Sequence, residues 1–143
     1  MQKLGQELIN FIQLNDMTES FWEHYESLDN GPKQLIFYSE VMALRIWTVG
    51  YTAYLIMENR EDYSLLIVSI EDYIRTNLNP ELLNLVLYRT NEYREFEDMD
   101  QPLEQAAAKF IENTKLDKEL GEEAVQMLKA FIGKVNFTIR EYY

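Results

Sequence analysis

A run of twelve uncharged residues, 46–57, constrains the fold of this chain more than any other feature. Arg45 precedes the run and Glu58 follows it. Twelve residues of α-helix rise about 18 Å, whereas the hydrocarbon layer of a membrane is about 30 Å thick. The run is too short to span a membrane. It predicts instead the buried half of a long helix over residues 33–59.

Turn-forming residues are scarce, because the 143 residues include only five glycines and three prolines. This scarcity favours few, long elements, which means helices rather than many short strands. Hydrophobic residues make up 47% of the chain and charged residues 27%, as is typical of globular domains. We therefore predict an all-α fold, a compact bundle of about seven helices that forms one domain over residues 1–143 around the helix at 33–59.

Local signals indicate several helix boundaries. Asp16, with Glu19 three residues later, predicts a capping box before the second helix. The turn at residues 29–32 places Pro32 at the start of the central helix, and Asn79 is expected to cap a later helix that begins at Pro80.

Residues 134–140 fit two kinds of structure. Val135, Phe137 and Ile139 alternate with polar residues, which is the period of a strand, but Phe131, Val135 and Ile139 also have helical spacing. A lone strand would leave its backbone groups unpaired, and no second strand is evident. We predict a helix here.

The net charge of −12, from 25 acidic and 13 basic side chains, limits the possible partners. A chain this acidic repels nucleic-acid phosphates and anionic lipid surfaces. We therefore expect no direct nucleic-acid binding and no membrane binding. The same charge attracts a basic protein, or competes with nucleic acid for one.

The sequence contains no recognisable catalytic pattern. The chain has no cysteine and one histidine, which excludes disulfides, thiolate chemistry and histidine-rich zinc sites. No nucleophile, phosphate-loop or metalloprotease motif is present. We expect no catalytic residue, no metal site and no cofactor, and the absence of cysteine suits a cytoplasmic location. The first sixteen residues lack the continuous apolar core and small-residue cleavage site of a signal peptide.

Two weaker patterns have a functional and a structural interpretation. His24 is a proton-transfer group beside Glu23, or it is a polar residue at the edge of an aromatic patch. Glu19, Glu23 and Glu26 form a stripe that offers oxygen ligands to a hard cation, or they form the solvated face of a helix. The structural interpretation is favoured for both.

Six carboxylates gather over residues 92–104 with two aromatic rings between them, and Arg94 is the only base. A surface that binds a basic protein needs charge for steering and rings for contact. The candidate partner-binding residues of this segment are Glu92, Tyr93, Glu95, Phe96, Glu97, Asp98, Asp100 and Glu104. The alternative is a charged helix end whose two rings turn inward, because both rings share core-facing helical spacing.

Three arginines near this segment have two interpretations. Arg75, Arg89 and Arg94 could bind a phosphate or a carboxylate of a ligand. On so acidic a protein they are expected instead to pair with acidic side chains of the same chain, such as Glu71 and Glu92.

These observations favour a non-enzymatic protein that occludes a basic partner. In small size, acidity and lack of catalytic residues the chain resembles toxin-neutralising immunity proteins and nucleic-acid-mimicking inhibitors, a resemblance of composition alone. The alternative is a homo-oligomeric helical scaffold or regulatory domain, for instance a homodimer with buried tyrosines. A third hypothesis is an enzyme or sensor that holds a divalent metal through helix-borne carboxylates.

Overall fold

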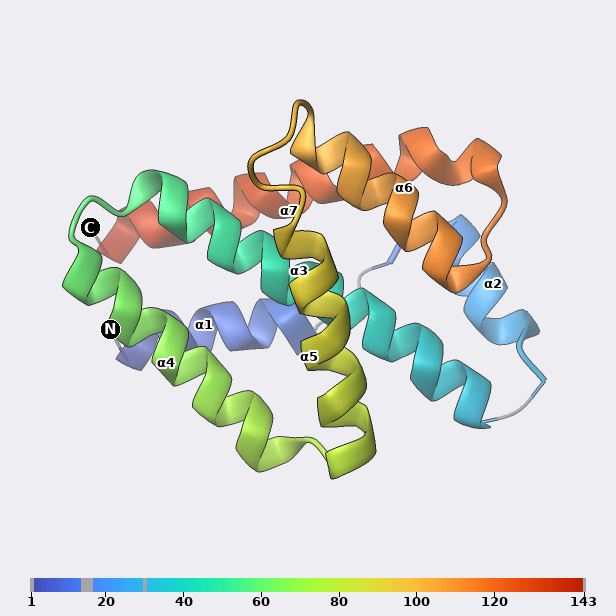
Figure 1. Ribbon diagram of the computed structural model, residues 1–143, viewed down its shortest axis with the longest axis horizontal. Coiled ribbons are helices and arrows are strands. Elements are labelled where there is room, and N and C mark those ends of the chain that lie inside the picture. The colour runs from blue at the N-terminus through green and yellow to red at the C-terminus, as the bar shows by residue number, and fades with distance from the viewer. Residues whose placement is uncertain (1, 14–16, 30, 143) are drawn as a thin grey trace.

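The computed structural model describes residues 2–13, 17–29 and 31–142 and shows an all-α bundle (Figure 1). This confirms the predicted fold class. A single-turn 3₁₀ helix, η1, precedes the last α-helix. The elements are α1 (Gln2–Gln13), α2 (Glu19–Ser27), α3 (Gly31–Ile56), α4 (Arg60–Asn77), α5 (Pro80–Arg94), α6 (Pro102–Thr114), η1 (Lys118–Leu120) and α7 (Gly121–Tyr142).

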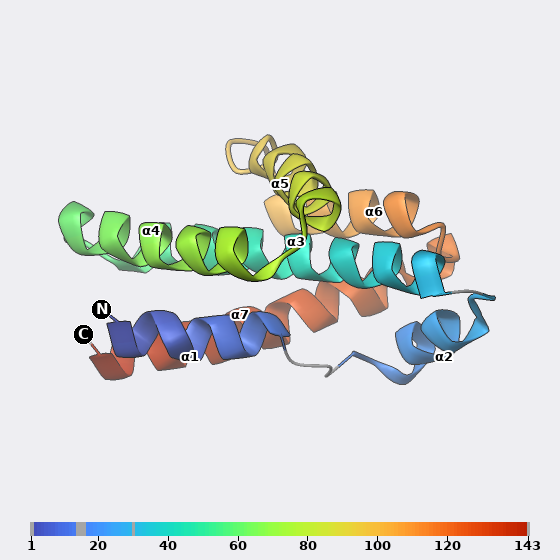
Figure 2. The same cartoon turned by 90° about the horizontal axis from the view of Figure 1, so that it is seen from below.

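Helix α3 is the centre of the bundle, as predicted. It contacts α1, α2, α4, α5, α6 and α7. Figure 2 shows α5 crossing one side of α3, while α1 and α7 lie on the other side. Most of α3 between Phe37 and Ala53 is buried, and Trp47 is only 2% exposed. An apolar helix that is surrounded on nearly all sides is stabilised by removing that surface from water.

The bounds of α3 differ slightly from the predicted 33–59. Pro32 lies in the first turn, as expected, and the helix ends at Ile56. It ends there because the chain turns to begin α4, where the Asn59 side chain accepts hydrogen bonds from the backbone N–H groups of Glu61 and Asp62. Tyr54 and Leu55, near this end, are more than half exposed.

Of the two predicted helix caps, one is confirmed and the other lies outside the described residues. Asn79 caps α5 by accepting a hydrogen bond of 2.9 Å from the backbone N–H of Leu82, as predicted. Helix α2 begins at Glu19, with Thr18 as its N-cap residue. The predicted capping residue Asp16 lies outside the described residues.

Residues 134–140 belong to α7, so the prediction of a helix is confirmed. Val135 and Ile139 are buried, whereas Phe137 is 67% exposed. Helices α1 and α7 lie side by side (Figure 2), and the Tyr142 hydroxyl donates to Oε1 of Glu7 at 2.8 Å. Within the described ranges, no helix is both long enough and apolar enough to cross a membrane.

Candidate functional site

The acidic segment 92–104 covers the end of α5, the loop 95–101 and the start of α6 (Figure 1). Five of its carboxylate side chains are exposed, and so they keep the surface strongly negative here: Glu95, Glu97, Asp98, Asp100 and Glu104.

The two rings of the segment are directed into the protein. Tyr93 is fully buried, with its ring centroid 6.1 Å from that of Trp47. Phe96 is partly buried against the hydrophobic core. The structure therefore does not present Tyr93 to a partner, because its ring is part of the core, and it presents only part of Phe96.

Glu92 and two of the arginines have partners within the chain. Glu92 pairs with Arg89 at 2.6 Å and with Lys109 at 3.5 Å. Arg94 lies 4.0 Å from Glu71. The expectation that Arg89 and Arg94 pair with acidic side chains of the same chain is confirmed.

Beside the acidic loop lies a cavity of about 760 Å³ between α3, α4 and the end of α5. We call it the aromatic groove. Pockets of this size hold small molecules or a few side chains of a partner. It is lined by Ile46, Trp47, Gly50, Tyr51, Tyr54, Leu55, Tyr63, Ile67, Ile70, Glu71, Thr90, Arg94, Glu97 and Asp98.

Four rings in this lining form two pairs. Trp47 and Tyr51 are stacked, with centroids 5.3 Å apart and an interplanar angle of 7°. Tyr54 and Tyr63 meet edge to face at 5.7 Å. Trp47 and Tyr51 come together because they are four residues apart on one helix, whereas Tyr54 and Tyr63 come from different helices.

Arg60 shows which chemical group these rings attract. Its guanidinium carbon lies 4.6 Å from the centroid of Tyr54 and 5.6 Å from that of Tyr63. The same guanidinium donates to the backbone carbonyls of Tyr54 and Met57. A cation over an aromatic face is attracted by the negative face of the ring.

Acidic side chains dominate the charge of the groove. Its lining holds three carboxylates, Glu71, Glu97 and Asp98, against the single guanidinium of Arg94. Trp47 Nε1 donates to Glu97 Oε1 at 3.1 Å, which joins the rings to the acidic loop. Burial, followed by the negative charge of Glu97, raises the pKa of the Tyr63 hydroxyl.

Sequence reasoning identified Glu97 and Asp98 but missed the rings beside them. The uncharged run 46–57 includes Trp47, Tyr51 and Tyr54, but its pattern did not distinguish rings of the core from rings of the groove. Tyr63, from the next helix along the chain, is half-buried at the groove.

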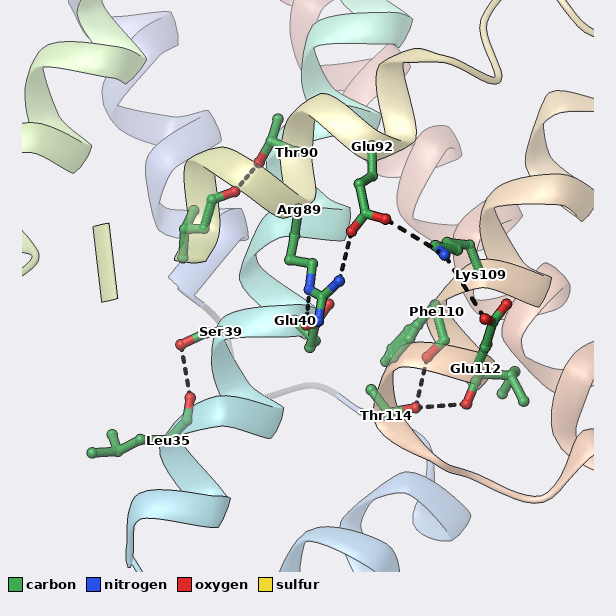
Figure 3. A network of polar contacts seen from close by, with 12 residues as sticks. Leu35, Ser39, Glu40, Arg89, Thr90, Glu92, Lys109, Phe110, Glu112 and Thr114 are labelled. Atoms are coloured by element: carbon green, nitrogen blue, oxygen red, sulfur yellow. Dashed lines mark hydrogen bonds and ion pairs between the residues drawn. The ribbon is translucent and has the colours of Figure 1, made fainter. Parts of the chain in front are cut away.

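A second polar centre lies where α3, α5 and α6 meet (Figure 3). Glu40 is only 1% exposed, and its Oε1 accepts from Arg89 Nε at 2.5 Å. Figure 3 shows how Arg89 also reaches Glu92, which in turn pairs with Lys109. Burial raises the pKa of the Glu40 carboxyl, and the nearby Arg89 guanidinium acts in the opposite direction.

The remaining candidates lie elsewhere. The ring of His24 packs 5.2 Å from that of Phe37, which agrees with its interpretation as part of an aromatic patch. Glu19, Glu23 and Glu26 are exposed on α2. In the part of the chain that the structure describes, no three acidic, histidine or cysteine side chains gather as ligands for a metal ion.

Comparison of the chain with protein-family models, with curated protein sequences and with solved structures gave no match.

Proposed function

We propose that this protein is a non-enzymatic, acidic binding protein, and that it occludes a basic surface of another protein. Its contact site is the aromatic groove together with the exposed carboxylates of the loop 95–101. The observation that carries the proposal is the hydrogen bond from Trp47 to Glu97, because it joins ring faces and negative charge in one cavity. We also propose a cytoplasmic location, which the lack of cysteine suits.

An arginine or lysine of the partner fits this cavity in two ways. The ring faces attract a cation by about 0.5–2 kcal/mol, more as the pair is desolvated. The carboxylates of Glu71, Glu97 and Asp98 supply charge complementarity, which speeds association and disfavours acidic partners. Arg60, which already lies over two of these rings, supports guanidinium as a suitable group.

The proposal is tested with short, labelled oligoarginine and oligolysine peptides and fluorescence anisotropy at low and physiological salt. The wild type should bind both peptides in a salt-sensitive manner, because exposed charges are screened within about 10 Å at 0.1 M salt. It should prefer arginine, because the planar guanidinium stacks on aromatic faces.

Two sets of variants separate the groove from the total charge. Glu97→Lys with Asp98→Lys should weaken binding at least about tenfold more than the matched pair Glu23→Lys with Glu26→Lys, which makes the same charge change on α2. Tyr51→Leu should weaken oligoarginine binding while leaving its salt dependence unchanged. Equal losses from the two charge-reversal pairs would show that total charge, and not this groove, holds the peptides.

A second candidate function is self-association as a helical scaffold. It is favoured by two apolar side chains one turn apart on α4, Leu65 and Val68, each 53% exposed. Exposed apolar surface is a common contact between protomers. Light scattering across a range of salt concentrations tests it, since an apolar dimer persists at high salt and a monomeric inhibitor shows no dimer at any salt.

A further inference from the structure

The second half of α7 differs in charge from the rest of this acidic chain. Residues 124–140 hold the bases Lys129, Lys134 and Arg140 and no acidic side chain, whereas the whole chain has 25 acidic against 13 basic side chains. Lys129 and Arg140 are exposed, and neither pairs with a carboxylate among the described residues. Arg140 donates to Oδ1 of Asn136 at 2.6 Å, which leaves its positive charge uncompensated.

An exposed ring lies between these two charges on the same face of the helix. Phe137 is 67% exposed, and Gly133, one turn earlier, is exposed as well. A Cβ atom at Gly133 would meet no neighbouring atom within 4 Å, so no other element of the described chain covers this stretch of α7. Lys129 and Arg140 are about 16 Å apart along the helix axis, because α-helix rises about 1.5 Å per residue. We call Lys129, Gly133, Phe137 and Arg140 the basic face of α7.

The acidic loop 95–101 carries groups that match this face. Four of its side chains are exposed carboxylates, and Met99 within it is 49% exposed. A methionine sulfur makes favourable contacts with aromatic rings, so Met99 suits Phe137, while the carboxylates suit the two bases. Figure 2 shows α5, which leads into the loop, and α7 on opposite sides of α3. The loop of one copy therefore meets the basic face only on another copy.

We propose that the basic face of α7 binds the acidic loop 95–101 of a second copy of this chain. The carboxylates of the loop pair with Lys129 and Arg140, and Met99 lies against Phe137. The contact joins two different surfaces, so further copies add head to tail. The inference rests on the proposed function, in which this loop binds a basic protein surface, and it identifies one such surface. A basic partner of another kind then competes with self-association for the loop.

The net charge of −12 makes two copies repel each other, and this sets the conditions of the test. At 0.1 M salt, charges more than about 10 Å apart are largely screened, so distant carboxylates repel weakly while charges in contact still attract. At 1 M salt the screening length is about 3 Å, and the contact should be lost. This dependence separates it from an apolar dimer through Leu65 and Val68, which persists at high salt.

Dilution of the full chain at 0.1 M salt, followed through its backbone amide signals by NMR, tests the contact. From about 2 mM protein downward, the signals of Met99, Gly133 and Phe137 should shift together. They should fit one dissociation constant on the order of 1 mM, because exposed ion pairs each contribute little. The same dilution at 1 M salt should leave all three signals in place.

Two pairs of substitutions separate this face from the total charge. Lys129→Glu with Arg140→Glu, the face variant, should weaken the association at least about tenfold. The matched pair Lys115→Glu with Lys118→Glu makes the same charge change after α6 and should weaken it less than about threefold. All four lysine and arginine side chains are exposed, and circular dichroism establishes that both variants fold. Equal losses from the two pairs would overturn the proposal, because general repulsion would account for them.

A mixture of two variants tests the head-to-tail arrangement. Glu95→Gln with Asp98→Asn, the loop variant, removes charge from the loop and keeps the basic face, whereas the face variant keeps the loop. Each variant alone should stay monomeric. Together they should form a 1:1 complex, with the signal of Phe137 shifting in the loop variant and that of Met99 shifting in the face variant. A mixture that stays monomeric while the wild type associates would contradict the arrangement.

Failure of this inference is distinguishable from failure of the proposed function. If oligoarginine binds the wild type but Gly133 and Phe137 do not shift on dilution, the self-association is wrong and the proposed function stands. If oligoarginine does not bind either, the loop binds no basic surface and both are wrong. Shifts confined to Leu65 and Val68 would place the contact between copies on α4 and overturn the role of α7.

Discussion

Nε1 of Trp47 donates a 3.1 Å hydrogen bond to Oε1 of Glu97, a residue 50 positions away in the sequence. Trp47 is a core residue, only 2% exposed, whereas Glu97 belongs to the exposed acidic loop. The bond holds a carboxylate in a defined position beside the rings of the aromatic groove. A binding site whose groups are already in place loses less conformational entropy when a partner arrives.

Glu97→Ala should lower the free energy of unfolding by about 0.5–1.5 kcal/mol, the usual contribution of one hydrogen bond. Glu95→Ala removes an exposed carboxylate from the same loop and should change it by less than about 0.5 kcal/mol. Urea unfolding measures both. Equal effects would mean that the bond to Trp47 contributes nothing to stability.

Tyr93→Phe should leave the stability unchanged or increase it. The hydroxyl of Tyr93 is buried and has no hydrogen-bond partner within the described residues, so its removal relieves an unsatisfied polar group. Tyr93→Ala removes the ring and should destabilise the protein by about 3–5 kcal/mol. Thermal unfolding of the two variants checks this, and a large loss with Tyr93→Phe would reveal a partner for the hydroxyl.

Glu40 should make stability depend on pH in a defined direction. Burial raises the pKa of its carboxyl above the ordinary value of 4.5, so the folded state binds this proton more readily than the unfolded state does. The contribution of Glu40 to stability is therefore greatest below the ordinary pKa and decreases as the pH rises through the raised one.

Glu40→Gln isolates this effect, because glutamine does not titrate. The unfolding free energy of the wild type minus that of the variant should fall as the pH rises from about 4 to about 8. Urea unfolding at several pH values measures the difference. A difference that stays level, or grows, across the window would contradict the raised pKa.

Arg89→Leu should be strongly destabilising at neutral pH, by about 3–5 kcal/mol, because it leaves the buried carboxylate of Glu40 without its cation. The loss should be smaller in the Glu40→Gln background, where no charge remains to be compensated. Arg94→Leu is the matched control. Its pair with Glu71 is exposed and 4.0 Å long, so its loss should stay within about 1 kcal/mol.

A double-mutant cycle of Arg89→Leu and Glu40→Gln, followed by chemical unfolding, gives the coupling between the two residues. Additive effects on the free energy of unfolding would show that Arg89 does not compensate the buried charge of Glu40.

Several features were predictable because they depend on residues close together in the chain. The uncharged run 46–57 predicted the buried part of α3, and Asn79 predicted the start of α5. The same holds for α7, where helical spacing accounted for Val135 and Ile139. Helical periodicity repeats every 3.6 residues, so it is visible in any window of the sequence.

The acidic loop is a part of the structure that local periodicity did not predict. Both Tyr93 and Glu97 belonged to the predicted contact segment, but the structure buries the first and joins the second to Trp47. Spacing showed that Tyr93 shares a face with core residues. It did not show which helix covers that face.

The sequence by itself determined an all-α chain, a central helix too short in its apolar part to cross a membrane, and a strongly acidic surface. Only the tertiary structure decided that four rings from α3 and α4 meet the acidic loop, and that Glu40 is buried against Arg89. The reason is physical. Local hydrogen bonds and periodicity form a helix, whereas the neighbours of each side chain depend on how distant helices pack, and that is set by the whole core at once.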